Sequence, residues 1–210
     1  GQDILNADGT QSLANNDEWK SIFKIFRDMA ADGTALMPDT KTEAGPTWTS
    51  YFPKGIIGVM PMPATLVGLS GGALADSDIG VTPIAGINGG QSTFIGGDDI
   101  GVSRDSKKAD AAWNFIAWLQ TEAAQVDVVA KNGNVLTRSD LANNKYSSAD
   151  PRLVLFNEIA AKGHTPLAKN FGATFNDPQG PWLVLMRDAV FGDGANIDAN
   201  NQAMNDSLNQ

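Results

Sequence analysis

The stretch from Ser92 to Gln120 constrains the fold of this chain more than any other. It contains a short run up to Ile95, the sequence Gly96-Gly97-Asp98-Asp99, an apolar segment from Ile100 to Val102, and an amphipathic segment. Paired glycines let a ligand or another strand come close to the backbone, and the amphipathic segment must cover a sheet with its apolar stripe. The sequence therefore predicts a bend between strand and helix, with exposed amides and two carboxylates where a ligand could bind.

The helix of this stretch is expected to begin near Lys107, with Ser106 as its N-cap. Its apolar residues recur at helical spacing: Ala109, Ala112, Trp113, Ile116 and Leu119, widened by Phe115 and Trp118. So wide a stripe indicates a helix that is covered on more than one side. We assign Trp113 and Trp118 to the core on this basis.

Elsewhere, apolar runs that fit short strands alternate with segments of helical periodicity. The sequence predicts helices at 17–33, 121–133, 151–163 and 181–192 and a weaker one at 198–208, and strands at 56–60, 78–84 and 100–102. Thr121 and Asp150-Pro151 fit helix starts, and Gly133 fits a helix stop. This alternation predicts an α/β fold in which helices cover a small sheet.

Composition excludes several classes of function. The chain has 210 residues, enough for one large domain or two small ones, and its formal net charge of −9 argues against nucleic-acid binding. It has no cysteine and one histidine, so we expect no metal site and no cofactor. No apolar stretch is long enough to span a bilayer, and no signal segment is visible. If the parent protein is exported, we expect this chain to begin after the signal.

One catalytic motif is present. Gly68-Leu69-Ser70-Gly71-Gly72 matches the G-x-S-x-G nucleophile elbow, which needs a strand before it, a helix after it and a histidine in space. The segment after Gly72 is too short for that helix, and His164 lies alone in a predicted turn. We therefore predict a protein that is not an enzyme, with an α/β hydrolase fragment using Ser70 as the alternative.

The order of several motifs resembles the C-terminal half of an extracytoplasmic solute-binding protein, of the carbohydrate-binding type that serves ABC importers. This chain has F-I-G-G-D-D-I-G-V-S-R-D-S-K-K where the family has F-x-G-G-x-x-L-A-I-x-x-x-S-K. It has A-A-W-N-F-I-A-W-L-Q-T-E-A-A-Q for the family's A-W-x-F-I-x-F-L-x-S-x-E-x-Q, and N-G-N-V-L-T-R for its G-x-x-P-T-R. The late segment G-P-W-L-V-L-M-R-D-A-V-F-G resembles the family's helix with a ligand-facing aromatic residue. One departure is Pro63-Ala64-Thr65, which stands where many members have Gly-Pro-Trp.

The resemblance implies a fold of the periplasmic-binding-protein type II class, of which this chain would be a part. By the family's layout, 1–93 and 150–210 belong to the C-terminal lobe, and 94–149 is an excursion into the N-terminal lobe, with hinge crossings near 93–96 and 135–138. The expected function is capture of a sugar between two lobes and delivery to permease subunits, outside the cytoplasm in the periplasm or as a cell-surface lipoprotein. The family also has an N-terminal portion that this chain lacks, and we expect that portion as a separate chain or self-association in its place. A folded truncation with no binding activity is a further alternative.

Several residues are candidate ligand contacts. Trp182 is either a core residue or, as the resemblance implies, a flat platform on which the apolar face of a sugar stacks. Asp98 and Asp99 are either solvated acids or acceptors for sugar hydroxyls, next to the open backbone of Gly97. Arg138 either donates to hydroxyls or ties its own segment to a nearby carboxylate. The remaining candidates are Trp48, Phe171 and Phe175, as aromatic surfaces that are more often core than pocket, and Asn176, as a donor to hydroxyls.

Overall fold

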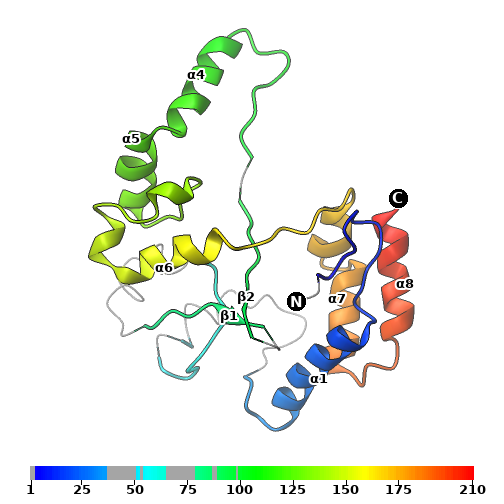
Figure 1. Cartoon of the computed structure of the whole chain (residues 1–210). Coiled ribbons are helices and arrows are strands. Elements are labelled where there is room, and N and C mark those ends of the chain that lie inside the picture. The colour runs from blue at the N-terminus through cyan, green and yellow to red at the C-terminus, as the bar shows by residue number, and fades with distance from the viewer. Residues whose placement is uncertain (1–2, 37–50, 53, 65–78, 87–88, 98) are drawn as a thin grey trace. The chain divides into compact units, whose positions relative to one another are not determined.

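The computed structural model describes residues 3–36, 51–52, 54–64, 79–86, 89–97 and 99–210 (Figure 1). The chain forms two compact units. The first unit consists of Gly1–Gly45 and Pro166–Gln210, and the second of Pro46–Thr165. The lobe boundaries that the family resemblance implies, with crossings near 93–96 and 135–138, stay a prediction.

The first unit is a small helical bundle. Its elements are α1 (Asp17–Ala31), the π-helix η5 (Gly172–Asn176), α7 (Pro181–Met186), the π-helix η6 (Arg187–Phe191) and α8 (Ile197–Leu208). In Figure 1, the blue α1, the orange α7 and the red α8 pack as neighbours. Their apolar faces enclose one core cluster, made of Ala14, Phe23, Leu185, Ala189, Val190, Ile197 and Met204.

Local signals in the sequence account for these helix ends. The Asn16 side chain accepts a hydrogen bond from the Trp19 amide at 2.9 Å, which satisfies one of the free donors at the start of α1. Pro181 is the first residue of α7, where no amide hydrogen is needed. Arg27 of α1 then ties the bundle together, because its guanidinium donates to the carbonyls of Ala189 and Asp193.

The second unit holds one short hairpin and several short helices. Strand β1 (Ile84–Ala85) pairs antiparallel with β2 (Gln91–Ser92). The helices are α4 (Ala109–Leu119), α5 (Glu122–Ala124), the π-helix η1 (Gln125–Val129), the 3-10 helices η2 (Ala130–Asn132), η3 (Ser139–Leu141) and η4 (Ser147–Ala149), and α6 (Pro151–Ala160).

Two distant segments of this unit run side by side. Phe94 forms a parallel bridge with His164, the Ile95 amide donates to the His164 carbonyl at 3.1 Å, and the His164 amide donates to the Thr93 carbonyl at 3.1 Å. Gly163 permits this approach, since a Cβ there would collide with the Ile95 side chain and lie 2.9 Å from Cγ2 of Thr93. The segment 93–95 is therefore joined to the segment that follows α6.

Several predicted helix ends are confirmed. Thr121 caps α5 by accepting from the Ala124 amide, and Asp150 caps α6 by accepting from the Arg152 amide. Gly133 ends the helical run that began at α5, and it adopts the left-handed conformation with φ 74°. Each of these ends depends on residues close in sequence, which is why the pattern could predict them.

Other expectations are wrong. No strand forms at 56–60 or 100–102, and of the described part of 78–84 only Ile84 is in a strand. Apolar residues make a strand only where a partner supplies hydrogen bonds, and Val59 is 86% exposed. Within the described residues, the structure is rich in helix and has one two-stranded sheet.

Helix α4 also departs from expectation. It begins at Ala109 rather than near Lys107, and Ser106, two residues before the N-cap Lys108, accepts from the Lys108 amide instead of capping the helix. Trp113 and Trp118, assigned to the core, are 55% and 45% exposed. Helical periodicity shows that an apolar face exists, and it does not show that these residues are covered in this chain.

Candidate functional site

Trp182 lies in the first turn of α7 within a row of aromatic side chains. Its ring meets that of Trp19 edge-on, with centroids 6.4 Å apart, and the ring of Phe175 at 5.8 Å. Phe175 in turn stacks on Phe171 at 4.8 Å. All four side chains are half-buried, and Phe175, Trp182 and Trp19 pack against the core cluster of the first unit.

This arrangement fixes the Trp182 ring from several sides while part of it stays accessible. Trp19 is itself anchored, because its indole nitrogen donates to the Asp3 carbonyl at 3.1 Å. A flat ring held in one orientation can bind an apolar surface with little loss of side-chain entropy. The contact between Trp19 and Trp182 joins residues that are far apart in sequence, and no local pattern predicts it.

Asn176 is the polar ligand residue that the sequence predicts in the first unit. It ends η5 directly after Phe175, and its side chain is exposed. Asn176 is thus the sequence neighbour of Phe175, whose ring contacts Trp182. An amide beside an aromatic ring can hydrogen-bond a ligand that the ring holds by stacking.

The other described candidates belong to the second unit. Gly97 and Asp99 are exposed, and a Cβ added at Gly97 would meet nothing within 4 Å. The backbone there is open to a partner, as the glycine pair predicted. Trp48, Asp98 and the Ser70 motif lie outside the described residues.

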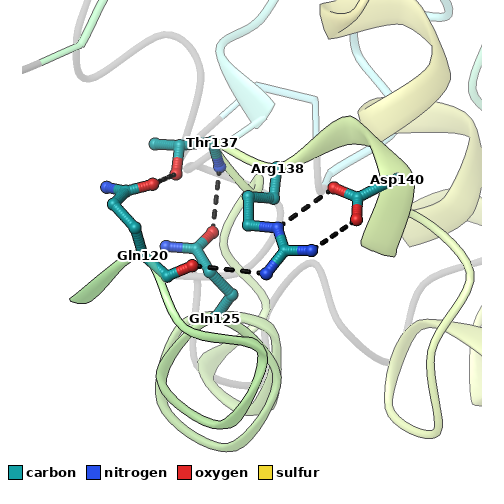
Figure 2. A network of polar contacts seen from close by, with 5 residues as sticks. All are labelled: Gln120, Gln125, Thr137, Arg138 and Asp140. Atoms are coloured by element: carbon teal, nitrogen blue, oxygen red, sulfur yellow. Dashed lines mark hydrogen bonds and ion pairs between the residues drawn. The ribbon is translucent and has the colours of Figure 1, made fainter. Parts of the chain in front are cut away.

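Arg138 lies in a polar network with four other residues of the second unit (Figure 2). Its guanidinium donates to both carboxylate oxygens of Asp140, at 3.1 and 2.5 Å, and to the Gln120 carbonyl at 3.3 Å. Gln120 also accepts from the Thr137 hydroxyl at 3.0 Å. Of the two roles proposed for Arg138, the tie to a nearby carboxylate is therefore present.

Arg138 and Asp140 each stabilise the charged form of the other. The hydrogen bond from Arg138 lowers the pKa of Asp140 below its usual value, and the hydrogen bond to Asp140 raises the pKa of Arg138. Both side chains are partly exposed, at 36% and 61%, so solvent screens the pair. Solvent access also leaves the guanidinium within reach of a solute that carries oxygen acceptors.

Two buried amides hold the backbone just before Arg138. The Gln125 side chain accepts from the Thr137 amide at 3.1 Å and donates to the Leu119 carbonyl at 2.8 Å. The Asn157 side chain accepts from the Leu136 amide at 2.8 Å. The segment 136–138 is therefore fixed to η1 and α6 by consecutive hydrogen bonds, and this fixes the position of Arg138.

The second unit also contains an open cavity of about 580 Å³. It is lined by Glu122, Ala123, Val126, Asp127, Leu141, Asn143, Asn144 and Lys145. The Lys145 ammonium lies 2.5 Å from Asp127, and this hydrogen bond lowers the pKa of the Asp127 carboxyl. The sequence indicated only a polar loop here, since the cavity depends on how 141–149 folds against η1.

The described part of the chain offers no clustered metal ligands. No group of three or more histidine, aspartate or glutamate side chains is arranged there to hold a metal ion. His164 is exposed, and its backbone is engaged by Thr93 and Ile95. Among the helices that the structure describes, none combines the length and apolar character needed to cross a bilayer.

Comparison with known proteins identifies the class. The model of the family described as bacterial extracellular solute-binding protein matches residues 1–154, which is most of the chain. The chain therefore belongs to this family of bacterial extracellular solute-binding proteins. A search of curated proteins gives no significant match.

Membership of this family confirms the predicted solute-binding class and supports a periplasmic-binding-protein-like fold. The helix-rich structure with little sheet is consistent with a part of that fold. Solute-binding proteins of this kind are generally not enzymes. Membership of the family thus indicates solute binding as the general function of the chain.

Proposed function

We propose that this protein is the substrate-binding component of an ABC importer and that its solute is a sugar or oligosaccharide. The family supports an extracellular binding role. The preference for a sugar is carried by one observation, the half-buried Trp182 ring within the aromatic row of the first unit. Sugar rings present apolar C–H faces, which stack on a rigid indole at low entropic cost.

Polar groups would complete recognition of the hydroxyls. Asn176 follows the aromatic row directly in sequence and offers both a donor and an acceptor. In the second unit we assign Asp98, Asp99 and the open backbone at Gly97 as further contacts. Arg138 would donate to the same class of ligand from the network in Figure 2, at the expense of part of its pairing with Asp140.

The remaining assignments follow from the same proposal. Trp48 is kept as a second aromatic contact, and the permease subunits of the importer are the expected protein partners. The protein acts outside the cytoplasm, in the periplasm or as a cell-surface lipoprotein, and the resemblance assigns part of one lobe to sequence beyond these 210 residues. No cofactor and no nucleic acid takes part.

Isothermal titration calorimetry with a panel of mono- and oligosaccharides tests this proposal. We expect saturable binding of at least one member, with no binding of amino acids or short peptides in a parallel panel. Asn176→Ala should weaken binding of that sugar, whereas the same change at Asn132, on η2, should leave its Kd unchanged. Binding of an amino acid or peptide instead of any sugar would contradict the proposed solute class and leave the family assignment intact.

Two alternatives make different predictions in the same experiment. A folded chain without binding activity gives no heat with any solute while its thermal transition stays cooperative. A hydrolase that uses Ser70 converts a bound ester or glycoside, and Ser70→Ala abolishes the conversion. We expect binding without turnover, and we expect Ser70→Ala to bind as the unmodified chain does.

A further inference from the structure

Trp19 contacts Trp182 but is not among the ligand residues that the sequence predicts. It lies in the first turn of α1, where its backbone amide donates to the side chain of Asn16 at 2.9 Å. Its ring stands almost at a right angle to that of Trp182, with an interplanar angle of 87° and centroids 6.4 Å apart. Edge-on contacts are a preferred geometry of aromatic pairs, so this contact favours one relative orientation of the two rings.

The Trp19 side chain is held at two further points. Its indole nitrogen donates to the Asp3 carbonyl at 3.1 Å, which satisfies the one polar group of the ring. Its ring lies 5.8 Å from the ring of Phe23, a core residue that is 1% exposed. A hydrogen bond at one edge and a packed ring beside it leave the indole little freedom to rotate. Trp19 is therefore a rigid neighbour for Trp182.

The segment that supplies the Asp3 carbonyl is fixed as well. Leu5 forms an antiparallel bridge with Ser12, and the Ser12 amide donates to the Asn205 side chain of α8 at 2.7 Å. The anchor of Trp19 thus depends on α8 as well as on α1, and both helices contribute to one core cluster.

Trp182 has a second aromatic neighbour on another element. Phe175 of η5 contacts the same ring, with centroids 5.8 Å apart and planes inclined at 49°. The Trp182 ring is thus contacted by two elements besides its own helix, at two different inclinations. Affinity falls when a side chain must be immobilised on binding, and a ring that is already immobile avoids this cost.

We propose that Trp19 is a positioning residue of the sugar site, which holds the Trp182 ring in the orientation in which a sugar stacks on it. The inference rests on the proposed function, in which Trp182 is the stacking surface. Trp19 acts through Trp182 and makes no contact with the sugar. Loss of the Trp19 ring frees Trp182 to rotate, so that the binding of a sugar must immobilise it again.

Dissociation constants measured by titration calorimetry with the tightest-binding saccharide test the role in binding. Trp19→Leu should raise the Kd roughly threefold to tenfold, the effect of immobilising one side chain on binding. Trp19→Phe should raise it less, because phenylalanine keeps an aromatic edge beside Trp182 although it loses the bond to the Asp3 carbonyl. Trp113→Leu, which truncates an exposed indole of α4, is the matched control and should leave the Kd unchanged.

A double-mutant cycle shows whether Trp19 acts through Trp182. In a Trp182→Ala background, Trp19→Leu should have no further effect on the Kd, because no ring is left to position. An equal effect of Trp19→Leu in both backgrounds would mean that Trp19 acts on the sugar or on the fold directly, and it would overturn the proposal.

Relaxation of the indole nitrogen nuclei, measured by NMR, reports the mobility of the tryptophan rings without any sugar. The Trp182 signal is identified by its absence in Trp182→Phe. Its order parameter should be about 0.85 in the unmodified chain and below about 0.6 in Trp19→Leu, while that of Trp113 should not change. A Trp182 order parameter that is indifferent to Trp19→Leu overturns the proposal, whether or not a sugar binds.

The proposed function and this inference fail in different ways. Absence of binding to every saccharide contradicts the proposed function, and the inference falls with it. Saccharide binding to the unmodified chain, together with an unchanged Kd in a folded Trp19→Leu protein, overturns the inference alone.

Discussion

Asn157 is 5% exposed, and its side-chain amide bonds two backbone groups from different segments. It accepts from the Leu136 amide and donates to the Leu153 carbonyl at 2.7 Å. Gln125, 3% exposed, makes the corresponding pair of bonds with Thr137 and Leu119. Buried amides in such positions are costly to replace, because truncation leaves the backbone partners without water or protein to bind.

Asn157→Ala should therefore lower the free energy of unfolding by about 2 kcal/mol. Its matched control is Asn132→Ala, since the Asn132 side chain also donates to a carbonyl, of Val128, but is exposed and should cost less than about 0.5 kcal/mol. Urea denaturation monitored by circular dichroism measures both. Equal effects of the two variants would show that burial of Asn157 contributes nothing.

For single residues, the sequence predicts those contacts whose partners are close in sequence. The caps at Thr121 and Asp150 and the stop at Gly133 depend on neighbours within a few residues, and all three are confirmed. The role of Asn157 depends on Leu136, which is 21 residues away. No pattern in the sequence marks such a partner.

Helix α6 begins at a strong local signal, and its stability has a definite dependence on pH. Asp150 caps the helix and also pairs with Arg152 at 2.6 Å. The hydrogen bond from Arg152 holds the pKa of Asp150 below its ordinary 3.8, although partial burial opposes this. Because the folded pKa is the lower one, the stabilisation is present above pH 3.8 and is lost as the pH falls through the folded pKa.

Asp150→Ala should cost about 1 kcal/mol at pH 7, and this cost should shrink as the pH falls below 3.8. Asp150→Asn should cost less at pH 7, because asparagine caps a helix almost as well and only the charge is lost. Urea titrations between pH 7 and pH 2.5 give both curves. A cost of Asp150→Ala that is the same at every pH would contradict the assigned role of its charge.

The two segments 93–95 and 163–165 form the other element-level feature, and Gly163 is its sensitive point. Gly163→Ala should destabilise the protein by about 1–3 kcal/mol, because the new methyl group collides with side chains of the neighbouring segment. Gly172→Ala, in η5, should instead stabilise by up to about 1 kcal/mol, since nothing lies within 4 Å of its new Cβ. Thermal unfolding compares them, and a stabilising Gly163→Ala would refute the close approach.

The wrong predictions concern elements whose structure or burial depends on partners that are distant in sequence. The apolar runs at 56–60 and 100–102 are bounded by turn residues as short buried strands are, yet neither finds a partner strand among the described residues. Helix α4 was predicted within two residues, but the burial of Trp113 and Trp118 was wrong. Periodicity fixes which residues share a face, and only tertiary contact decides whether that face is covered.

For the molecule as a whole, the motif order gave the class correctly, since the family of bacterial extracellular solute-binding proteins matches residues 1–154. The sequence named each candidate residue separately and did not predict which of them lie together. Of those residues, Trp182 packs its ring on Phe175, which directly precedes Asn176 in sequence, and Arg138 lies in the network of the second unit. The contacts of Trp182 with Trp19 and Phe175 could not be predicted, because those residues lie on two other helical elements, α1 and η5.

A solute that binds only the folded chain must stabilise it by mass action. At a concentration one hundred times its Kd, the bound sugar should add about 2.7 kcal/mol. For a chain of 210 residues that unfolds as one unit, this corresponds to a rise in Tm of roughly 5–10 °C. Differential scanning calorimetry with the bound sugar and with a non-binding stereoisomer measures the shift, and equal Tm values with both would speak against specific binding.

The role of Trp182 is tested most directly by the dissociation constants of three variants, measured by titration calorimetry with the tightest-binding saccharide. Trp182→Ala should raise the Kd at least about tenfold and Trp182→Phe by less, because phenylalanine keeps a smaller stacking face. Trp113→Ala, which removes an exposed indole of α4, should leave the Kd unchanged. A folded Trp182→Ala protein that binds the saccharide as tightly as the unmodified chain would contradict the proposed site.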